Sequence, residues 1–143
     1  MNPKRLLLAI VVVFVGVFAT DFIIHGVLLQ KTYAATMSLW RPEAEMQAHM
    51  PWMSLAQLLA ATTFVVLYAA GFASTATVRS AAFYGLFMGL FSQVMTLVLY
   101  TVQPMPPGLA VKWFVTGIAQ NVVLGVIVFF AYKPKPVAVQ SNP

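Results

Sequence analysis

Residues 6–29 read LLLAIVVVFVGVFATDFIIHGVLL, a continuous apolar run that is long enough to cross a lipid bilayer as one helix, because about 20 helical residues span the hydrocarbon core. Three further runs of this kind cover residues 52–72, 81–102 and 109–132. Strands of a membrane barrel would instead alternate in polarity over segments of about ten residues. The sequence therefore predicts an all-α polytopic membrane protein, a bundle of four transmembrane helices.

The composition supports a membrane protein and excludes several other classes. Of 143 residues, 61% are hydrophobic and 8% are charged, whereas soluble domains carry about 25% charged residues. The formal net charge of +5 comes from few residues, which indicates contact with the bilayer and its headgroups rather than with nucleic acid. The absence of cysteine excludes disulfides, thiolate metal sites and cysteine nucleophiles. We expect a single membrane domain over residues 1–143.

The basic residues predict the orientation, because cytoplasmic segments of membrane proteins carry an excess of Lys and Arg. With both termini in the cytoplasm, five basic residues lie inside and three outside; the three are Lys31, Arg41 and Lys112. We therefore expect cytoplasmic termini, an uncleaved first span and an extended cytoplasmic tail over residues 133–143. Side chains typical of membrane interfaces flank the spans, and the expected anchors are Trp40, Arg41, Trp52 and Trp113.

The segment between the first two spans is the longest aqueous connection. Proline is favoured at the first position of a helix, so Pro42 is the expected start of a short helix there. Glu43 and Glu45 would lie near the positive end of that helix. The sequence predicts a short interfacial helix between spans one and two.

Asp21 is the only acidic residue within the four apolar runs, and a charged side chain at the centre of a bilayer costs roughly 2.5–3.5 kcal/mol on insertion scales. His25 follows four residues later, on the same face of a helix. A helix rises by about 1.5 Å per residue, and on this scale each of the four spans brings polar side chains to a similar depth in the outer half of the membrane. We regard these polar side chains as candidates for a ligand or proton site; they are Asp21, His25, Gln57, Gln93, Tyr100, Gln120 and Asn121.

Small residues predict where helices pack closely. Gly85 and Gly89 form a Gly-x-x-x-Gly motif, and Gly117 lies in the fourth span. Glycines at such positions let two helix backbones approach each other. We expect a bundle that is tight in its cytoplasmic half and polar in its outer half.

Three interpretations of Asp21 and His25 remain open at this point. They could form a hydrogen-bonded pair that fixes helix register, since polar contacts between membrane helices often serve packing alone. They could handle a proton or a small solute. They could also bind a metal or haem, although two ligands do not make a metal site.

A second group combines thioether and imidazole side chains, which suit Cu(I); its members are Met46, His49, Met50 and Met53. The alternative is ordinary packing, because methionine fills irregular apolar space. A haem held by His25 and His49 is a further alternative, although neither lies deep in a span opposite the other. We predict no cofactor, with copper and haem as the alternatives.

Two stretches of the sequence resemble a known group. The first is Phe18–Gly26, followed by Tyr33 and Leu39–Pro42; the second is Tyr84–Gly89, followed by Pro104–Pro106. Together they resemble small four-span bacterial inner-membrane proteins grouped as domains of unknown function. The resemblance runs roughly from Leu6 to Tyr132 and implies a four-helix bundle in a bacterial cytoplasmic membrane. It implies no activity and no site.

The leading functional interpretation is a non-enzymatic accessory subunit that packs against other membrane protein subunits or against itself. One alternative is a proton-, small-solute- or metal-handling protein that uses the polar site. Another is a membrane redox protein that binds haem or a quinone.

Overall fold

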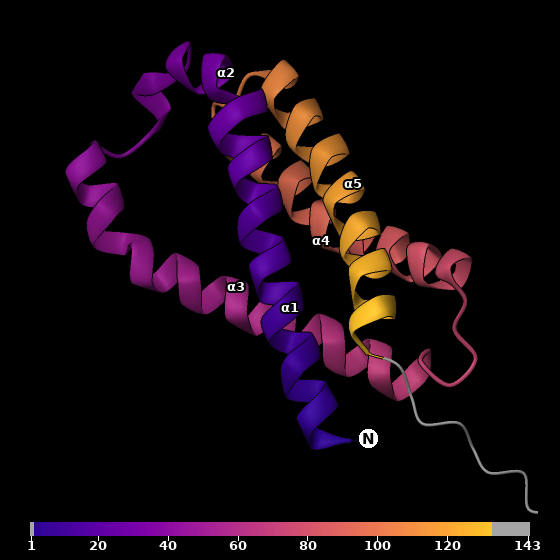
Figure 1. Cartoon of the computed structure of the whole chain (residues 1–143). Helices are drawn as coiled ribbons and strands as arrows, with labels where there is room; N and C mark the ends of the chain where they lie inside the picture. The colour runs from indigo at the N-terminus through magenta and orange to yellow at the C-terminus, as the bar shows by residue number, and fades with distance from the viewer. Residues whose placement is uncertain (1, 133–143) are drawn as a thin grey trace, which may run out of the picture.

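The computed structural model describes residues 2–132 of the chain. Its elements in chain order are α1 (Pro3–Asp21), the π-helical segment η1 (Phe22–Leu28), α2 (Gln30–Ala34), the 3₁₀ turn η2 (Met37–Leu39), α3 (Glu43–Gly71), α4 (Val78–Val102) and α5 (Pro107–Ala131). Among the described residues, four helices are long and apolar enough to cross a membrane: α1 together with η1, α3, α4 and α5 (Figure 1). The protein is a small multi-pass membrane protein of all-α fold, as predicted. The expected tail over residues 133–143 lies outside the described part.

The short helical piece between the first two spans is present, but it lies earlier than Pro42. It consists of α2 and the turn η2. Pro42 is instead the N-cap residue of α3, and that helix continues to Gly71 with Pro51 inside it. A proline within a helix removes one backbone donor without necessarily ending the helix. The stretch after Pro42 is therefore the beginning of the second spanning helix rather than a separate interfacial one.

α4 and α5 form an antiparallel pair whose backbones approach closely. A Cβ atom added at Gly85 would overlap the backbone carbonyl of Asn121, and one at Gly89 would lie 2.9 Å from the Cα of Ile118. On the opposite helix, a Cβ at Gly125 would overlap the carbonyl oxygen of Ala81. Glycine is needed at these positions because any side chain would separate the two helices.

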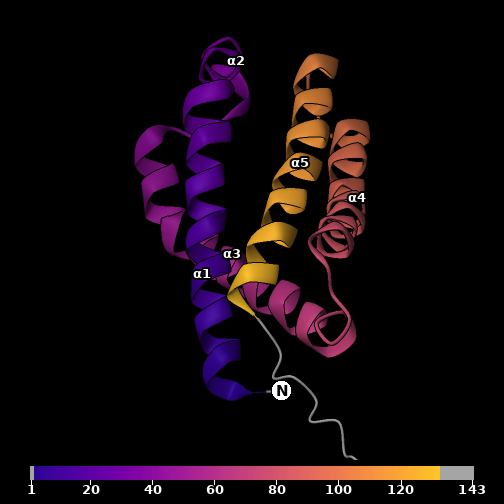
Figure 2. The same ribbon diagram turned by 45° about the vertical axis from the view of Figure 1, so that its right-hand side comes forward.

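α5 lies between α1 and α4, as Figure 2 shows, and α3 packs on α1. The main apolar core lies towards the end of the bundle that holds the N-terminus, and its fully buried side chains include Ala9, Val13, Val65, Tyr68 and Val128. The Tyr84 hydroxyl donates to the Phe64 carbonyl at 2.5 Å and so ties α4 to α3. We call this end of the bundle the N-terminal end and the opposite one the α2 end.

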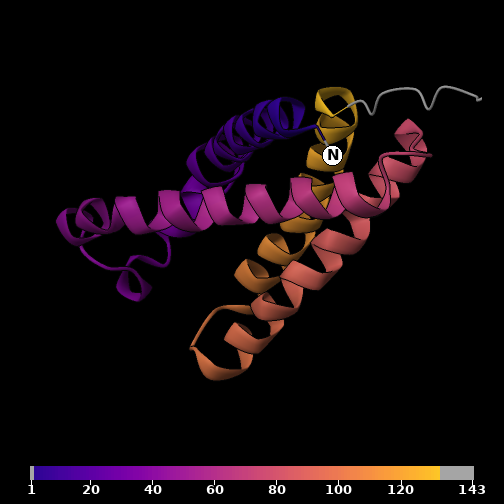
Figure 3. The same cartoon turned by 90° about the horizontal axis from the view of Figure 1, so that it is seen from below.

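α3 diverges from the other helices towards the α2 end. Seen from below, it runs across them rather than alongside (Figure 3). Its aromatic contacts with α4 lie in its last turns, where Phe64, Tyr68 and Phe72 surround Tyr84. Residues 41–53 are all exposed. The bundle is therefore closed at the N-terminal end and open between α3 and α4 at the α2 end.

Candidate functional site

The backbone departs from α-helical geometry directly after Asp21. Asp21 is the last residue of α1, and η1 follows with seven residues in π-helical conformation. At its end, the Leu29 amide donates to the carbonyl of Ile24, five residues earlier, at 2.8 Å. Such wide turns are rare and occur frequently at functional sites. Asp21, the only acidic residue within the four apolar runs of the sequence, thus directly precedes the most unusual backbone segment of the first span.

Two other helices donate hydrogen bonds to the Asp21 carboxylate. Gln57 of α3 donates from Nε2 to Oδ2 at 2.5 Å, and Gln120 of α5 donates from Nε2 to Oδ1 at 2.6 Å. The second amide hydrogen of Gln120 goes to Thr20 Oγ1 at 2.8 Å, and the Thr20 hydroxyl donates in turn to the Gly16 carbonyl at 2.7 Å. One carboxylate therefore joins three spanning helices. Its two oxygens both accept a hydrogen bond from an amide.

His25 lies beside this carboxylate and connects it to the α2 end. Its Nε2 is 4.0 Å from Asp21 Oδ1, and its side chain is 46% exposed. Its Nδ1 is 2.5 Å from the Tyr33 hydroxyl oxygen, which also accepts a hydrogen bond from Trp113 Nε1 at 2.8 Å. The rings of His25 and Tyr33 are stacked with centroids 5.9 Å apart. His25, Tyr33 and Trp113 thus form a hydrogen-bonded row that ends 4.0 Å from the Asp21 carboxylate.

Burial raises the pKa of the Tyr33 hydroxyl above its usual value. The hydrogen bond from Trp113 partly offsets this rise, and the nearby Asp21 charge adds to it. Tyr33 therefore keeps its O–H proton at neutral pH and can act as a donor.

Tyr33 also belongs to an aromatic cluster with Trp40 and Trp113. The centroid of Trp40 lies 5.4 Å from that of Tyr33 and 5.8 Å from that of Trp113. These rings pack over the buried side chains of Met105 and Leu109. Two expected anchors, Trp40 and Trp113, therefore pack against each other at the α2 end.

The other two expected anchors lie apart from this cluster. Trp52 is exposed on α3. Arg41 is exposed and forms an ion pair with Glu45 at 3.5 Å.

A pocket of about 200 Å³ opens beside the Asp21 cluster, by which we mean Asp21 with His25, Gln57 and Gln120. The polar and aromatic residues that line this pocket are His25, Gln93, Thr96, Trp113, Thr116 and Gln120. The Gln93 amide lies over Gly117, because a Cβ added at Gly117 would overlap it. Thr96 holds that amide by donating to Gln93 Oε1 at 2.6 Å. Within residues 2–132, Gln93 Nε2 and Gln120 Oε1 have no hydrogen-bond partner. The pocket lining therefore includes a free amide NH₂ group, with two hydrogens to donate, and a free amide oxygen that can accept.

The structure leaves two of the sequence candidates outside this cluster. Asn121 donates to the Gly117 carbonyl of its own helix at 2.9 Å, and its Cβ faces Gly89 of α4. Tyr100 is 41% exposed near the end of α4. Asp21, His25, Gln57 and Gln120 come together, and Gln93 borders the pocket.

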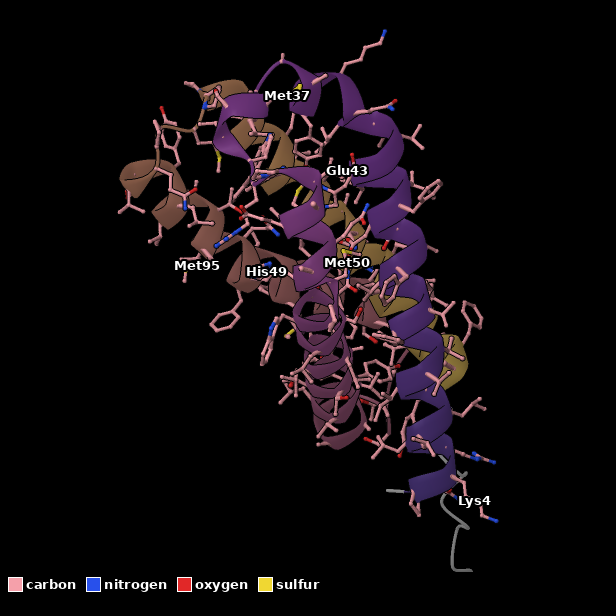
Figure 4. All side chains as sticks on the ribbon, turned by 90° about the vertical axis from the view of Figure 1, so that its left-hand side faces the viewer. Lys4, Met37, Glu43, His49, Met50 and Met95 are labelled. Atoms are coloured by element: carbon pink, nitrogen blue, oxygen red, sulfur yellow. The ribbon has the colours of Figure 1, made fainter. Side chains whose placement is uncertain are left out.

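The thioether and imidazole group lies on the exposed first half of α3. Met46, Met50 and Met53 are exposed, as is His49, and Figure 4 shows His49 and Met50 on the same helix as Glu43, about two turns further along. The ring nitrogen Nδ1 of His49 is hydrogen-bonded to the carbonyl of Glu45 at 2.7 Å. Within residues 2–132, no group of three or more His, Asp or Glu side chains is placed to hold a metal ion.

Sequence reasoning did not find the roles of Tyr33 and Thr20. Tyr33 follows His25 by eight residues and is separated from it by the end of η1, so no helical spacing relates the two. Thr20 adjoins Asp21, but an adjacent residue on a helix normally faces elsewhere. The sequence did contain one pointer to both residues, because each carries a hydroxyl group and lies in or just after the span that holds Asp21.

No protein-family model, no curated protein and no solved structure matches this chain. The comparisons therefore identify no family. The resemblance to small four-span bacterial proteins carries only the helical architecture, which the structure has.

Proposed function

We propose that this membrane protein binds a small, uncharged solute with hydrogen-bonding groups in the pocket beside Asp21. The observation that carries this proposal is the pair of unpaired amide atoms, Gln93 Nε2 and Gln120 Oε1, in one pocket. Both amides are held in place by their other atoms, Gln93 by Thr96 and Gln120 by Asp21 and Thr20. Binding groups that are fixed beforehand lose little entropy when a ligand arrives.

The pocket limits the size and chemistry of the solute. Its volume of about 200 Å³ lies below the roughly 300–1,000 Å³ of pockets for drug-sized ligands. A free donor and a free acceptor suit a compact molecule that offers both, such as a carboxamide or a urea. The Trp113 ring supplies an apolar wall. In this proposal Asp21 orients Gln120 rather than contacting the solute.

The test uses purified protein in lipid nanodiscs, with acetamide, urea and nicotinamide as probes, observed by ligand-detected NMR. We expect saturation transfer from the protein to at least one probe, and loss of that transfer in Gln93→Leu. Gln47→Leu is the control, because Gln47 is an exposed amide on α3 that bonds only to Glu43. Absence of transfer for every probe, or equal transfer in Gln93→Leu, would contradict the proposal.

A second candidate function is that of an accessory subunit, and the open flank between α3 and α4 favours it. α3 leaves the other helices towards the α2 end, so apolar side chains of its middle turns, including Leu55 and Leu59, face away from the bundle. Membrane helices associate through close packing rather than through hydrophobicity. A partner helix could fill the space that α3 leaves.

A matched pair of photo-crosslinking positions tests this second candidate. Leu59 on α3 and Leu8 on α1 are both 59% exposed, so lipid alone would contact them equally. A crosslinker at Leu59 that joins a specific second chain in native membranes, while one at Leu8 does not, supports the accessory role. Lipid adducts alone at both positions contradict it.

A further inference from the structure

The row of contacts from Tyr33 to Asp21 leads from the α2 end of the bundle into the first span. Tyr33 lies on α2, outside the spanning helices, and is half-buried. His25 touches it through Nδ1 and faces Asp21 through Nε2. Each side chain in this row carries or accepts an exchangeable proton. The row is therefore a sequence of proton carriers rather than a packing contact alone.

The hydrogen-bond partners of His25 and Tyr33 favour one arrangement of the hydrogens on these two side chains. The Asp21 carboxylate accepts from two amides, and the tautomer of His25 that presents a further donor to it has its hydrogen on Nε2. In neutral imidazole, Nδ1 is then the acceptor and receives the Tyr33 O–H. Trp113 donates to the same hydroxyl oxygen, which leaves the Tyr33 hydrogen for His25. In this tautomer all donors in the row point towards Asp21.

We infer that Tyr33 and His25 carry protons between the aqueous phase at the α2 end and Asp21. The Tyr33 hydroxyl proton passes to His25 Nδ1 while a proton from water replaces it on the tyrosine oxygen. The proton on His25 Nε2 passes to Asp21 Oδ1. The net change is one proton moved from water to the carboxylate, with the imidazole left neutral in its other tautomer. Rotation of the exposed His25 ring closes the 4.0 Å gap to Asp21. Exchange with water at this exposed ring, which removes the proton from Nδ1 and adds one to Nε2, restores the first tautomer.

The path has one open end. Towards the N-terminal end, α1 continues from Asp21 with the buried side chains of Val17, Val13 and Ala9. The Thr20 hydroxyl next to Asp21 donates back to the Gly16 carbonyl of its own helix. In residues 2–132, this row of proton carriers does not continue from Asp21 towards the N-terminal end. Protons therefore enter and leave on the α2 side. Asp21 is then a proton-binding site that responds to one side of the membrane.

The surrounding elements present mostly uncharged groups to this row. α3 contributes Gln57, and α5 contributes Gln120 and Trp113. The pocket face of α4 contributes Gln93 and Thr96, which are also uncharged. The titratable neighbours at the open end are Tyr33 itself and Lys112 of α5, whose ammonium donates to Thr32 of α2 at 2.8 Å. The inference goes beyond the proposed solute and does not depend on it.

The test follows protonation of Asp21 by infrared spectroscopy, with the full chain in proteoliposomes and no solute present. After a downward pH jump, the C=O stretching band of a protonated carboxylic acid should appear in the wild type and be absent in Asp21→Asn. Tyr33→Phe should slow its appearance by ~10-fold, which corresponds to a barrier about 1.4 kcal/mol higher, while the final amplitude stays the same. Tyr100→Phe is the control and should match the wild type.

Sidedness and rescue complete the test. The chain has no cysteine, so a Ser38→Cys variant carries a single thiol, at an exposed position of η2. Labelling of this thiol with a membrane-impermeant reagent shows on which side of the membrane the α2 end lies. A jump on that side should give the fast response, and one on the other side should not. Exogenous imidazole should restore the rate in His25→Ala. Equal rates in Tyr33→Phe and the wild type, equal response from both sides, or no Asp21 band would overturn the inference, whatever the result of the solute experiment.

Discussion

The side-chain amide of Gln120 lies 2.6 Å from the Asp21 carboxylate, although 99 positions separate the two residues in the chain. This bond joins α5 to α1 in a part-buried region between the spanning helices. Gln57 adds the same type of bond from α3 at 2.5 Å. The relative rotation of three helices is therefore tied to one carboxylate.

Replacing Gln120 by Leu should destabilise the bundle by about 1–3 kcal/mol, because the Asp21 carboxyl group loses a donor and remains partly buried. Unfolding in mixed detergent micelles measures the change. The double variant Asp21→Leu/Gln120→Leu should lose less than the sum of the two single variants, because removing both partners leaves no unpaired group. Strict additivity would show that the bond contributes nothing. Gln47→Leu, at an exposed amide on α3, is the control.

Replacing Gly85 by Ala should destabilise the fold by about 1–3 kcal/mol through overpacking. The added methyl group would overlap the Asn121 carbonyl, and a backbone atom cannot move aside as a side chain can. Gly71→Ala is the matched control, since nothing lies within 4 Å of a Cβ at that helix end. Thermal unfolding of both variants checks the difference. Equal melting temperatures would mean that α4 and α5 do not pack as closely as described.

The sequence predicts the meeting of Asp21 and Gln120 to the extent that depth decides it, whereas the same estimate places Gln57 roughly 6 Å nearer the outer surface. A helix rises by a constant amount per residue, and a polar side chain in lipid needs a partner, so groups at equal depth are expected to meet. Depth says nothing about rotation about the helix axis. Gln120 and Asn121 are neighbours at one depth, yet Gln120 faces Asp21 and Asn121 faces α4.

Features that depend on tertiary packing could not be predicted in this way. The π-helical segment after Asp21 changes the direction of every following side chain, and no residue type in Phe22–Leu28 requires it. The contact of Tyr33 with His25 crosses the end of that segment. The divergence of α3 depends on its contacts with α1 and with Tyr84 at the N-terminal end. Apolar patterns fix the length of a spanning helix but leave its tilt open.

Replacing Gly117 by Ala should abolish solute binding while costing little stability. The new methyl group would occupy the position of the Gln93 amide, which is the end of a flexible side chain and can move aside. The amide then loses its bond with Thr96 and no longer points into the pocket. NMR transfer to the probes reports binding, and thermal unfolding reports stability. A variant that binds as the wild type does would show that Gln93 is not a binding group; Gly71→Ala, far from the pocket, serves as the control.

Replacing Tyr33 by Phe should reduce the loss of stability at alkaline pH. Burial raises the pKa of the Tyr33 hydroxyl in the folded protein, whereas in the unfolded chain it ionises near pH 10. Below that pH both states hold the proton and the stabilisation is complete. As pH rises, the unfolded state releases the proton first, so stability falls until the pH passes the folded pKa. Unfolding free energies from neutral pH to above pH 10 should therefore decline less steeply in Tyr33→Phe than in the wild type or in Tyr100→Phe, and parallel curves for all three proteins would show that the Tyr33 hydroxyl is as accessible to water as in the unfolded chain.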